Sequence, residues 1–486
     1  MTEQRHVHRH RQRFVVATTT FTLALMLAAC GGASVRHWTP ASERDSHDDP
    51  ATLRPGYGSG EFPTWWPLTE SSADFYSRIK KAKAGDAQAL LDLAILASGD
   101  HRDADGRRAI QRRVDQFITK LRPDVSAAAN DLERGYLLYR SMHEVFFNGE
   151  KGELGSYKLE QSRVTAIFDT GRYNCISSAM LFVVLTRAFS LPVRGVLVPT
   201  HAFVEFGARG RKVVDVETTS IDGFAVLHDE HFYKEAAVHW TSSRGLRPIT
   251  IDDYRQRKIV EPHRLMAMGM INQAIQPETT GEDRGRLVEM AALVDPESTE
   301  VQRARMQSYA LEARALYERK AQRTLAKMFD AMEPELEKVM LKFAADSETM
   351  RTARWVESVF ADALQVVGRS REAAALVDDA LPSVDMKWED SKALRQNFLN
   401  ILSDQMLTLM TKKNYVGAVK AVSKHIDTCR SESVCAHNLA VVYSNWANDD
   451  LYAGNRQGAR KALQECVTQL PDDAQCAYAL KIFGNR

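Results

Sequence analysis

Apolar residues recur at helical spacing through most of the chain, and a stretch in its middle breaks this pattern. From about Ser71 to Arg122 the apolar positions lie three and four residues apart, which predicts two or three helices. From about Glu261 to the C-terminus the spacing is helical again. Residues 31 to about 65 show almost no apolar periodicity and are rich in Gly, Ser, Pro, His and Asp, so this segment is predicted to be a flexible spacer.

The middle segment, from about Leu132 to Val260, combines helices with short β-branched or alternating runs. One helix is expected at residues 132–147, and another begins at Cys175 and ends before Leu191-Pro192. Three short strands are predicted next: Val193–Val198, His201–Phe206 and Lys212–Val216. This order predicts an α+β fold in which a helix precedes an antiparallel sheet.

The connection between the second and third strands decides which residues lie opposite each other. A five-residue turn at Gly207–Arg211 would place His201 directly opposite Glu217 in an antiparallel pair. The same register would place Asp215 opposite Phe203. A carboxylate across from a histidine holds the imidazole in one tautomer and supports its protonated form.

Three side chains of this segment have the types and the placement that nucleophilic catalysis requires. Cys175 lies at a helix N-terminus, where the helix dipole and backbone N–H groups stabilise a thiolate and lower the cysteine pKa from about 8.5. His201 is placed to exchange a proton with the thiol. Glu217 is the first candidate for the acid, and Asp215, on the same strand face, is the rival. Each residue alone is more often structural, and only their combination favours catalysis.

These residues and their order resemble the bacterial transglutaminase-like superfamily. Four runs carry the similarity: Tyr173–Ala179, Leu191–Val196, Thr200–Glu205 and Val213–Thr219. The resemblance implies a papain-like core in which Cys175, His201 and Glu217 act on amide or ester bonds of a protein or peptide through an acyl-enzyme, without cofactor or metal. Many members carry Asp-Pro-Thr where this chain has Glu217-Thr218-Thr219, so the acid is a glutamate by this alignment. Protease, amidase and transglutaminase activities all remain open.

The first 29 residues have the features of a signal peptide rather than a permanent anchor helix. Basic residues precede an apolar stretch of 16 residues, Phe14–Ala29, whereas a transmembrane helix calls for roughly 20. The run Leu27-Ala28-Ala29-Cys30 resembles the bacterial lipobox, which implies cleavage before Cys30 and acylation of that cysteine. The histidines at positions 6, 8 and 10 lie in the removed segment and receive no metal-binding role.

Composition agrees with a globular body that is held at a membrane by lipid. Removal of residues 1–29 takes away four arginines and one glutamate, so the formal charge falls from +1 to −2, which does not favour nucleic-acid binding. No other apolar run approaches membrane length. No Asp follows Cys30, so the resemblance to sorted lipoproteins implies a place in the cell envelope, at the outer membrane and facing the periplasm.

Four of the six cysteines lie near the C-terminus: Cys429, Cys435, Cys466 and Cys476. An oxidising compartment permits two disulfides among them, and three pairings are possible. If Cys435 starts one helix and Cys466 ends the next, an antiparallel helix pair brings these two together, so this pairing is the first choice. The spacing lacks the paired short gaps of a zinc site.

The last part of the chain is predicted to consist of helix pairs joined by short turns. The segment Val434–Ala440 echoes Gln475–Leu480 at a distance of about 41 residues, which resembles tetratricopeptide repeats, although their period is about 34. An unspecific helical bundle is the alternative. Either arrangement offers a surface to a protein or peptide partner.

The expected organisation is a signal peptide, a spacer, N-terminal helices, a transglutaminase-like domain, a helical connector and tetratricopeptide-like repeats, at residues 1–29, 30–65, 66–125, 126–260, 261–350 and 351–486. Two function classes follow from it. The first is a membrane-anchored enzyme with a transglutaminase-like cysteine site. The second is a catalytically inactive lipoprotein that binds protein partners through its helical repeats.

Overall fold

The computed structural model describes residues 66, 71–100, 103–147, 157–207, 213–225 and 250–484. The predicted signal peptide, the predicted lipidation site Cys30 and the predicted spacer lie outside these residues. The chain divides into two compact units: unit 1 includes residues 70–279, and unit 2 includes residues 54–69 and 280–486. Within the described ranges, no helix is both long enough and apolar enough to cross a membrane.

The described helices of unit 1 are α2 (Ser72–Lys83), α3 (Ala87–Ala97), α4 (Ala104–Ala127), α5 (Asp131–Phe146), α7 (Val164–Thr170), α8 (Cys175–Ala188), α10 (Ile251–Arg255) and α11 (Pro262–Ala274). Polar residues define where the first four begin. The side chains of Ser71, Asp86, Asp103 and Asn130 each accept a hydrogen bond from the backbone N–H three residues later. Helices α2, α3 and α4 occupy the region in which two or three helices were predicted.

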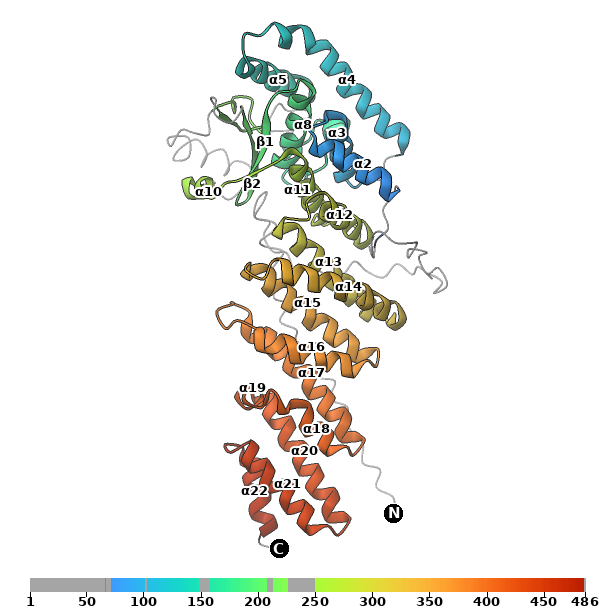
Figure 1. Cartoon of the computed structure of the whole chain (residues 1–486), viewed down its shortest axis with the longest axis vertical. Coiled ribbons are helices and arrows are strands. Elements are labelled where there is room, and N and C mark those ends of the chain that lie inside the picture. The colour runs from blue at the N-terminus through green and yellow to red at the C-terminus, as the bar shows by residue number, and fades with distance from the viewer. Residues whose placement is uncertain are drawn as a thin grey trace. The chain divides into compact units, whose positions relative to one another are not determined.

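The described sheet of unit 1 has the strand order β3-β2-β1-β4, and each neighbouring pair is antiparallel. Its strands are β1 (Val193–Val198), β2 (His201–Phe206), β3 (Val214–Val216) and β4 (Lys258–Val260). Helix α8 packs against β1 and β2, and α3 and α11 pack against α8 (Figure 1). All of β2 is buried, so both of its faces are covered. The prediction of a helix followed by an antiparallel sheet is confirmed.

The predicted register between β2 and β3 is wrong by two residues. Phe206 pairs with Val214, and Asp215 lies opposite Glu205 rather than Phe203. The strands are joined by a longer connection than the assumed five-residue turn. Because side chains alternate with a period of two, this shift keeps each side chain on its predicted face. Glu217 follows the end of β3 and does not lie directly opposite His201 in the ladder.

Unit 2 is built from helices that pack in successive pairs (Figure 1). The described helices are α12 (Gly281–Val294), α13 (Thr299–Glu318), α14 (Gln322–Lys342), α15 (Ser347–Val366), α16 (Ser370–Ala380), η2 (Leu381–Ser383), α17 (Ser391–Thr411), α18 (Tyr415–Ser423), α19 (Ile426–Ser431), α20 (Ser433–Tyr452), α21 (Arg456–Gln469) and α22 (Ala474–Gly484). The long helices also contact one another in sequence, α13 with α15, α15 with α17, and α17 with α20.

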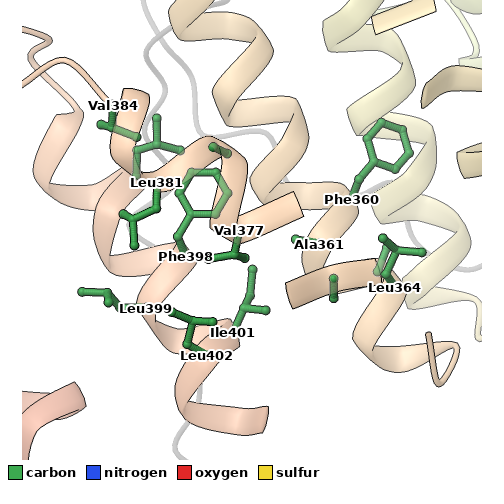
Figure 2. Close-up of a cluster of buried hydrophobic side chains, with 14 of the residues drawn as sticks. Phe360, Ala361, Leu364, Val377, Leu381, Val384, Phe398, Leu399, Ile401 and Leu402 are labelled. Carbon is green, nitrogen blue, oxygen red and sulfur yellow. The ribbon is translucent and has the colours of Figure 1, made fainter. Parts of the chain in front are cut away.

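A continuous apolar core joins these helix pairs. Phe360 and Leu364 of α15, Val377 of α16, and Phe398 and Leu402 of α17 belong to one buried cluster, part of which is shown in Figure 2. A fully buried Leu or Phe side chain contributes about 1.5–3 kcal/mol relative to an exposed one. Burial between helices therefore holds the pairs together, because isolated helices of this length are marginal in water.

The four C-terminal cysteines lie in two pairs at disulfide distance. Cys429 is bonded to Cys435 and Cys466 to Cys476, with Cα–Cα distances of 5.2 and 5.6 Å. The expected pairing of Cys435 with Cys466 is wrong. Each bond joins a helix to the next helix along the chain, α19 to α20 and α21 to α22, whereas the prediction joined the start of one long helix to the end of the helix after it.

Candidate active site

Cys175 is the first residue of α8, and a reciprocal cap fixes the helix start at this position. The Asn174 side chain accepts hydrogen bonds from the backbone N–H groups of Ile176 and Ser177, both at 3.1 Å. The Ser177 hydroxyl in turn accepts one from the Asn174 N–H at 2.9 Å. The Cys175 side chain is fully buried. The sulfur therefore lies at a rigid helix N-terminus, where the helix dipole favours an anion.

A buried polar network holds this cap from the other side. The Asn174 amide group donates to the backbone oxygen of Leu159 at 2.9 Å and to the Ser162 hydroxyl at 3.1 Å. Asn272 of α11 donates to the same hydroxyl at 2.8 Å. The segment before α7 and helix α11 thus fix the side chain that caps the cysteine helix.

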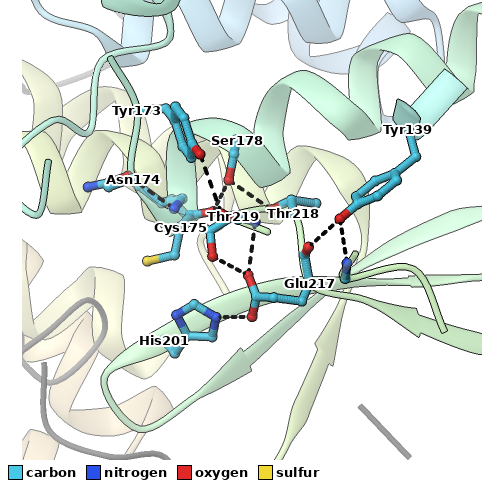
Figure 3. A network of polar contacts seen from close by, with 11 residues as sticks. Tyr139, Tyr173, Asn174, Cys175, Ser178, His201, Glu217, Thr218 and Thr219 are labelled. Carbon is cyan, nitrogen blue, oxygen red and sulfur yellow. Dashed lines mark hydrogen bonds and ion pairs between the residues drawn. The ribbon is translucent and has the colours of Figure 1, made fainter. Parts of the chain in front are cut away.

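His201, the first residue of β2, lies between the thiol and a carboxylate. Its Nε2 atom is 2.5 Å from Oε2 of Glu217, and both side chains are buried. Figure 3 shows the Cys175 sulfur on the side of the imidazole ring that faces away from Glu217. The structure therefore brings Cys175, His201 and Glu217 together, with the histidine in the middle.

The charges of His201 and Glu217 support each other. Burial favours neutral His201, but the Glu217 carboxylate and hydrogen bonds with Cys175 and Glu217 outweigh burial and raise the pKa of His201 to about 10. Burial also opposes ionisation of Glu217, yet the charge of His201 and hydrogen bonds from His201 and Thr219 hold the pKa of Glu217 below its ordinary value of 4.5. At neutral pH the site thus holds an imidazolium between a carboxylate and a sulfur.

Neighbouring groups clamp Glu217 in this orientation. Its Oε1 atom accepts hydrogen bonds from the Thr219 N–H at 3.0 Å and the Thr219 hydroxyl at 2.7 Å. The Tyr139 hydroxyl of α5 donates to the Glu217 backbone oxygen at 3.0 Å and accepts from the Gly223 N–H at 2.9 Å. A Cβ atom at Gly223 would lie 2.1 Å from that backbone oxygen, so only glycine fits here.

Two further contacts tie the cysteine helix to the acid-bearing loop (Figure 3). The hydroxyls of Ser178 and Thr218 are hydrogen-bonded at 2.8 Å, and the Tyr173 hydroxyl donates to the backbone oxygen of Thr219 at 3.3 Å. Both pairs are buried. Helix α8 and the loop after β3 are therefore held in one fixed arrangement around His201.

Asp215, the rival acid, lies in a different cluster. Arg257 donates to both of its carboxylate oxygens at 2.7 Å, and the Tyr254 hydroxyl donates to one of them. Arg257 also donates to Glu205 at 3.2 Å. Asp215 is thus the partner of Arg257, and their contact joins β3 to the segment between α10 and β4. The partner of His201 is Glu217.

Three residues of the site, Asn174, Tyr139 and Gly223, were not predicted from the sequence pattern. Asn174 carried a readable signal, because an Asn directly before an apolar helix is a common N-cap. Tyr139 is 78 residues from Glu217 and 84 from Gly223. No local pattern identifies a contact over such separations, so these two residues became visible only in the fold.

The described residues contain no group of three or more His, Cys, Asp or Glu side chains that could hold a metal ion. Residues 108–251 match the family described as the transglutaminase-like superfamily. The match covers less than a third of the chain, includes Cys175, His201 and Glu217, and ends before α11. No curated protein and no solved structure matches the chain significantly. The chain therefore contains a transglutaminase-like superfamily domain.

Proposed function

We propose that this protein is a lipid-anchored enzyme that acts on amide or ester bonds through an acyl-enzyme on Cys175, as a protease, amidase or transglutaminase. The observation that carries the proposal is the position of buried His201 between the thiol of Cys175 and the carboxylate of Glu217. A site of this composition activates a cysteine by keeping it as a thiolate beside an imidazolium.

In the acylation step, the Cys175 sulfur attacks the carbonyl carbon of the substrate. A sulfur–carbon bond forms, the bond from that carbon to the leaving nitrogen or oxygen breaks, and the His201 imidazolium gives its proton to the leaving group. Glu217 keeps the ring in place and stabilises its charge, as the carboxylate does in a Ser-His-Asp triad. The hydrogen bonds from Thr219 keep Glu217 itself from rotating.

Negative charge develops on the substrate oxygen during this attack. The N–H groups of Ile176 and Ser177 donate to Asn174 and serve the helix cap. We assign the backbone N–H of Cys175 to the oxyanion, because it belongs to the same residue as the attacking sulfur, at the start of α8. The acceptor, which is water in hydrolysis and an amine in acyl transfer, then attacks the thioester carbon while His201 removes its proton. The new bond to the acceptor forms, the sulfur–carbon bond breaks, and Cys175 returns as a thiolate beside the imidazolium.

The proposal is tested by labelling the intact protein under non-reducing conditions with iodoacetamide or a vinyl-sulfone probe, followed by peptide mapping. We expect fast labelling of Cys175, slowed at least tenfold in His201→Ala, and no labelling of Cys429, Cys435, Cys466 or Cys476, which are bonded in pairs. Equal labelling rates in the wild type and His201→Ala would overturn the proposal.

An unreactive Cys175 would leave the second candidate function, a catalytically inactive lipoprotein that binds protein partners through unit 2. The succession of contacts from α13 to α15, α17 and α20 supports such a role, because stacked helix pairs of the tetratricopeptide type present extended binding surfaces. In the enzyme proposal the same surface would recruit a protein or peptide substrate.

We also propose that Cys30 is acylated and holds the protein in the cell envelope, at the outer membrane and facing the periplasm. The cysteine pairs at disulfide distance support an oxidising compartment. Cys30→Ala should leave the protein uncleaved or release it from sedimenting membranes. Normal processing and continued co-sedimentation of this variant would contradict the assignment.

A further inference from the structure

The turn that precedes His201 has a backbone conformation that its residues do not favour. Val198 of β1 pairs with His201 of β2, so Pro199 and Thr200 form the hairpin connection. The proline ring holds φ near about −65°, and Thr200 has a φ of +70°. This combination is typical of a type II turn, in which Gly or Asn is preferred at the second position. A β-branched residue there is strained.

The hydroxyl of Thr200 adds a second unfavourable feature. The residue is 8% exposed, and within the described part of the chain its Oγ1 atom has no hydrogen-bond partner. Buried hydroxyls nearly always have a partner, because burial removes the hydrogen bonds that water supplies. Gly or Asn would suit this backbone better, and Val would suit this burial better. Neither the backbone conformation of the turn nor the burial of the side chain therefore explains why this residue is a threonine.

The position of Thr200 gives these two features a common explanation. Thr200 directly precedes His201, and the same short turn sets the start of the strand that carries the imidazole. Strained residues persist mainly where the surrounding structure holds them for a purpose, and they cluster at active sites. The hydroxyl belongs to the residue next to the histidine in the chain and has no hydrogen-bond partner among the described residues, so it is available to a ligand.

We propose that the Thr200 hydroxyl binds the amide group of the substrate whose carbonyl carbon Cys175 attacks. This inference rests on the proposed function and adds a substrate-binding residue to Cys175, His201 and Glu217. A hydroxyl donates one hydrogen bond and accepts others, so it can pair with either the N–H or the C=O of an amide. The bound substrate supplies the partner that the folded chain does not.

The test compares two small reagents on Cys175 of the full-length protein. Iodoacetamide carries an amide group, and methyl methanethiosulfonate does not, so the ratio of their rates cancels changes in thiolate content and access. Thr200→Val keeps the shape and removes the hydroxyl, and Thr200→Ser keeps the hydroxyl. We expect the ratio to fall about three- to tenfold in Thr200→Val, the effect of one hydrogen bond, and to change less than about twofold in Thr200→Ser.

Thermal unfolding of the same variants checks that the hydroxyl has no structural role. Thr200→Val should unfold at the wild-type temperature or above it, because an unpartnered buried hydroxyl is replaced by a methyl group. A clearly lower unfolding temperature, or an unchanged rate ratio with Cys175 still reactive, would overturn the role of Thr200 and leave the proposed function intact. A wild-type Cys175 that reacts with neither reagent would overturn both.

Discussion

The Nε2 atom of His201 lies 2.5 Å from Oε2 of Glu217, and both side chains are at most 3% exposed. A buried ion pair adds little net stability compared with an apolar pair, but the loss of one partner leaves an uncompensated charge. In the proposed function, the pair therefore serves the chemistry of the neighbouring thiol more than it serves stability. The ion pair also makes the contribution of Glu217 to the free energy of unfolding depend on pH.

Glu217→Gln should lower the free energy of unfolding most between about pH 5 and 6.5, by about 3 kcal/mol. In the wild type the pKa of His201 is raised to about 10, so its stabilising share is complete below 6.5 and is lost as the pH rises towards 10. The pKa of Glu217 is lowered, so its share is lost as the pH falls below about 4.5. The difference in free energy of unfolding between wild type and variant should therefore become smaller below about pH 4.5 and above about pH 6.5.

Urea denaturation from pH 4 to 9 measures this difference, with Glu160→Gln as a control because Glu160 is an exposed glutamate of the same unit. The control should differ from the wild type by less than about 0.5 kcal/mol at every pH. A difference in free energy of unfolding between wild type and Glu217→Gln that does not vary with pH would show that His201 and Glu217 do not form an ion pair.

Tyr139→Phe should destabilise unit 1 by about 1–3 kcal/mol, because it removes the hydroxyl that joins the backbone groups of Glu217 and Gly223. Tyr136 is on the same helix and is 46% exposed, so Tyr136→Phe is the matched control and should change stability by less than about 0.5 kcal/mol. Denaturant unfolding of both variants measures these two changes in stability. Equal effects would remove Tyr139 from the support of the acid.

The strands β1 and β2 were predictable because β-branched and aromatic residues alternate there between clear breakers, and α8 was predictable from its apolar spacing and from Leu191-Pro192. The register of β3 was not predictable, because the residues near the turn do not show how long the connection from β2 is. Strand β4 was missed because it has three residues, two of them exposed. Its backbone pairing with β1 makes it a strand, and its own residue pattern does not indicate one.

The choice between the two acids shows a similar limit. Asp215 lies in β3 and Glu217 comes two residues later, so pattern alone leaves either side chain facing His201. Arg257 decides the matter in the structure by taking both oxygens of Asp215, and it lies 42 residues further along the chain. The disulfide pairing depended in the same way on which helix ends meet, and spacing does not tell this.

Non-reducing peptide mapping should recover Cys429 linked to Cys435 and Cys466 linked to Cys476. Reduction should lower the stability of unit 2 by about 2–3 kcal/mol per bond, because each bond closes a loop of about ten residues or fewer in the unfolded chain. A peptide that links Cys435 to Cys466 would contradict this connectivity.

Asp215→Asn should reduce stability by about 3 kcal/mol, since it weakens the pairing of a fully buried carboxylate with the partly buried Arg257, and should leave the reactivity of Cys175 near that of the wild type. Glu217→Gln should reduce that reactivity at acidic pH. Alkylation rates of both folded variants at pH 6 compare the two carboxylates. A larger loss in Asp215→Asn would transfer the role of the acid to Asp215.

The pH dependence of Cys175 alkylation by iodoacetamide tests the central claim most directly. If His201 holds Cys175 as a thiolate, the wild-type rate should stay high well below the ordinary thiol pKa of about 8.5. In His201→Ala the profile should move towards that value, and the rate at pH 6 should fall by at least tenfold. A wild-type Cys175 that titrates like a free thiol, with the same profile in His201→Ala, would contradict the account.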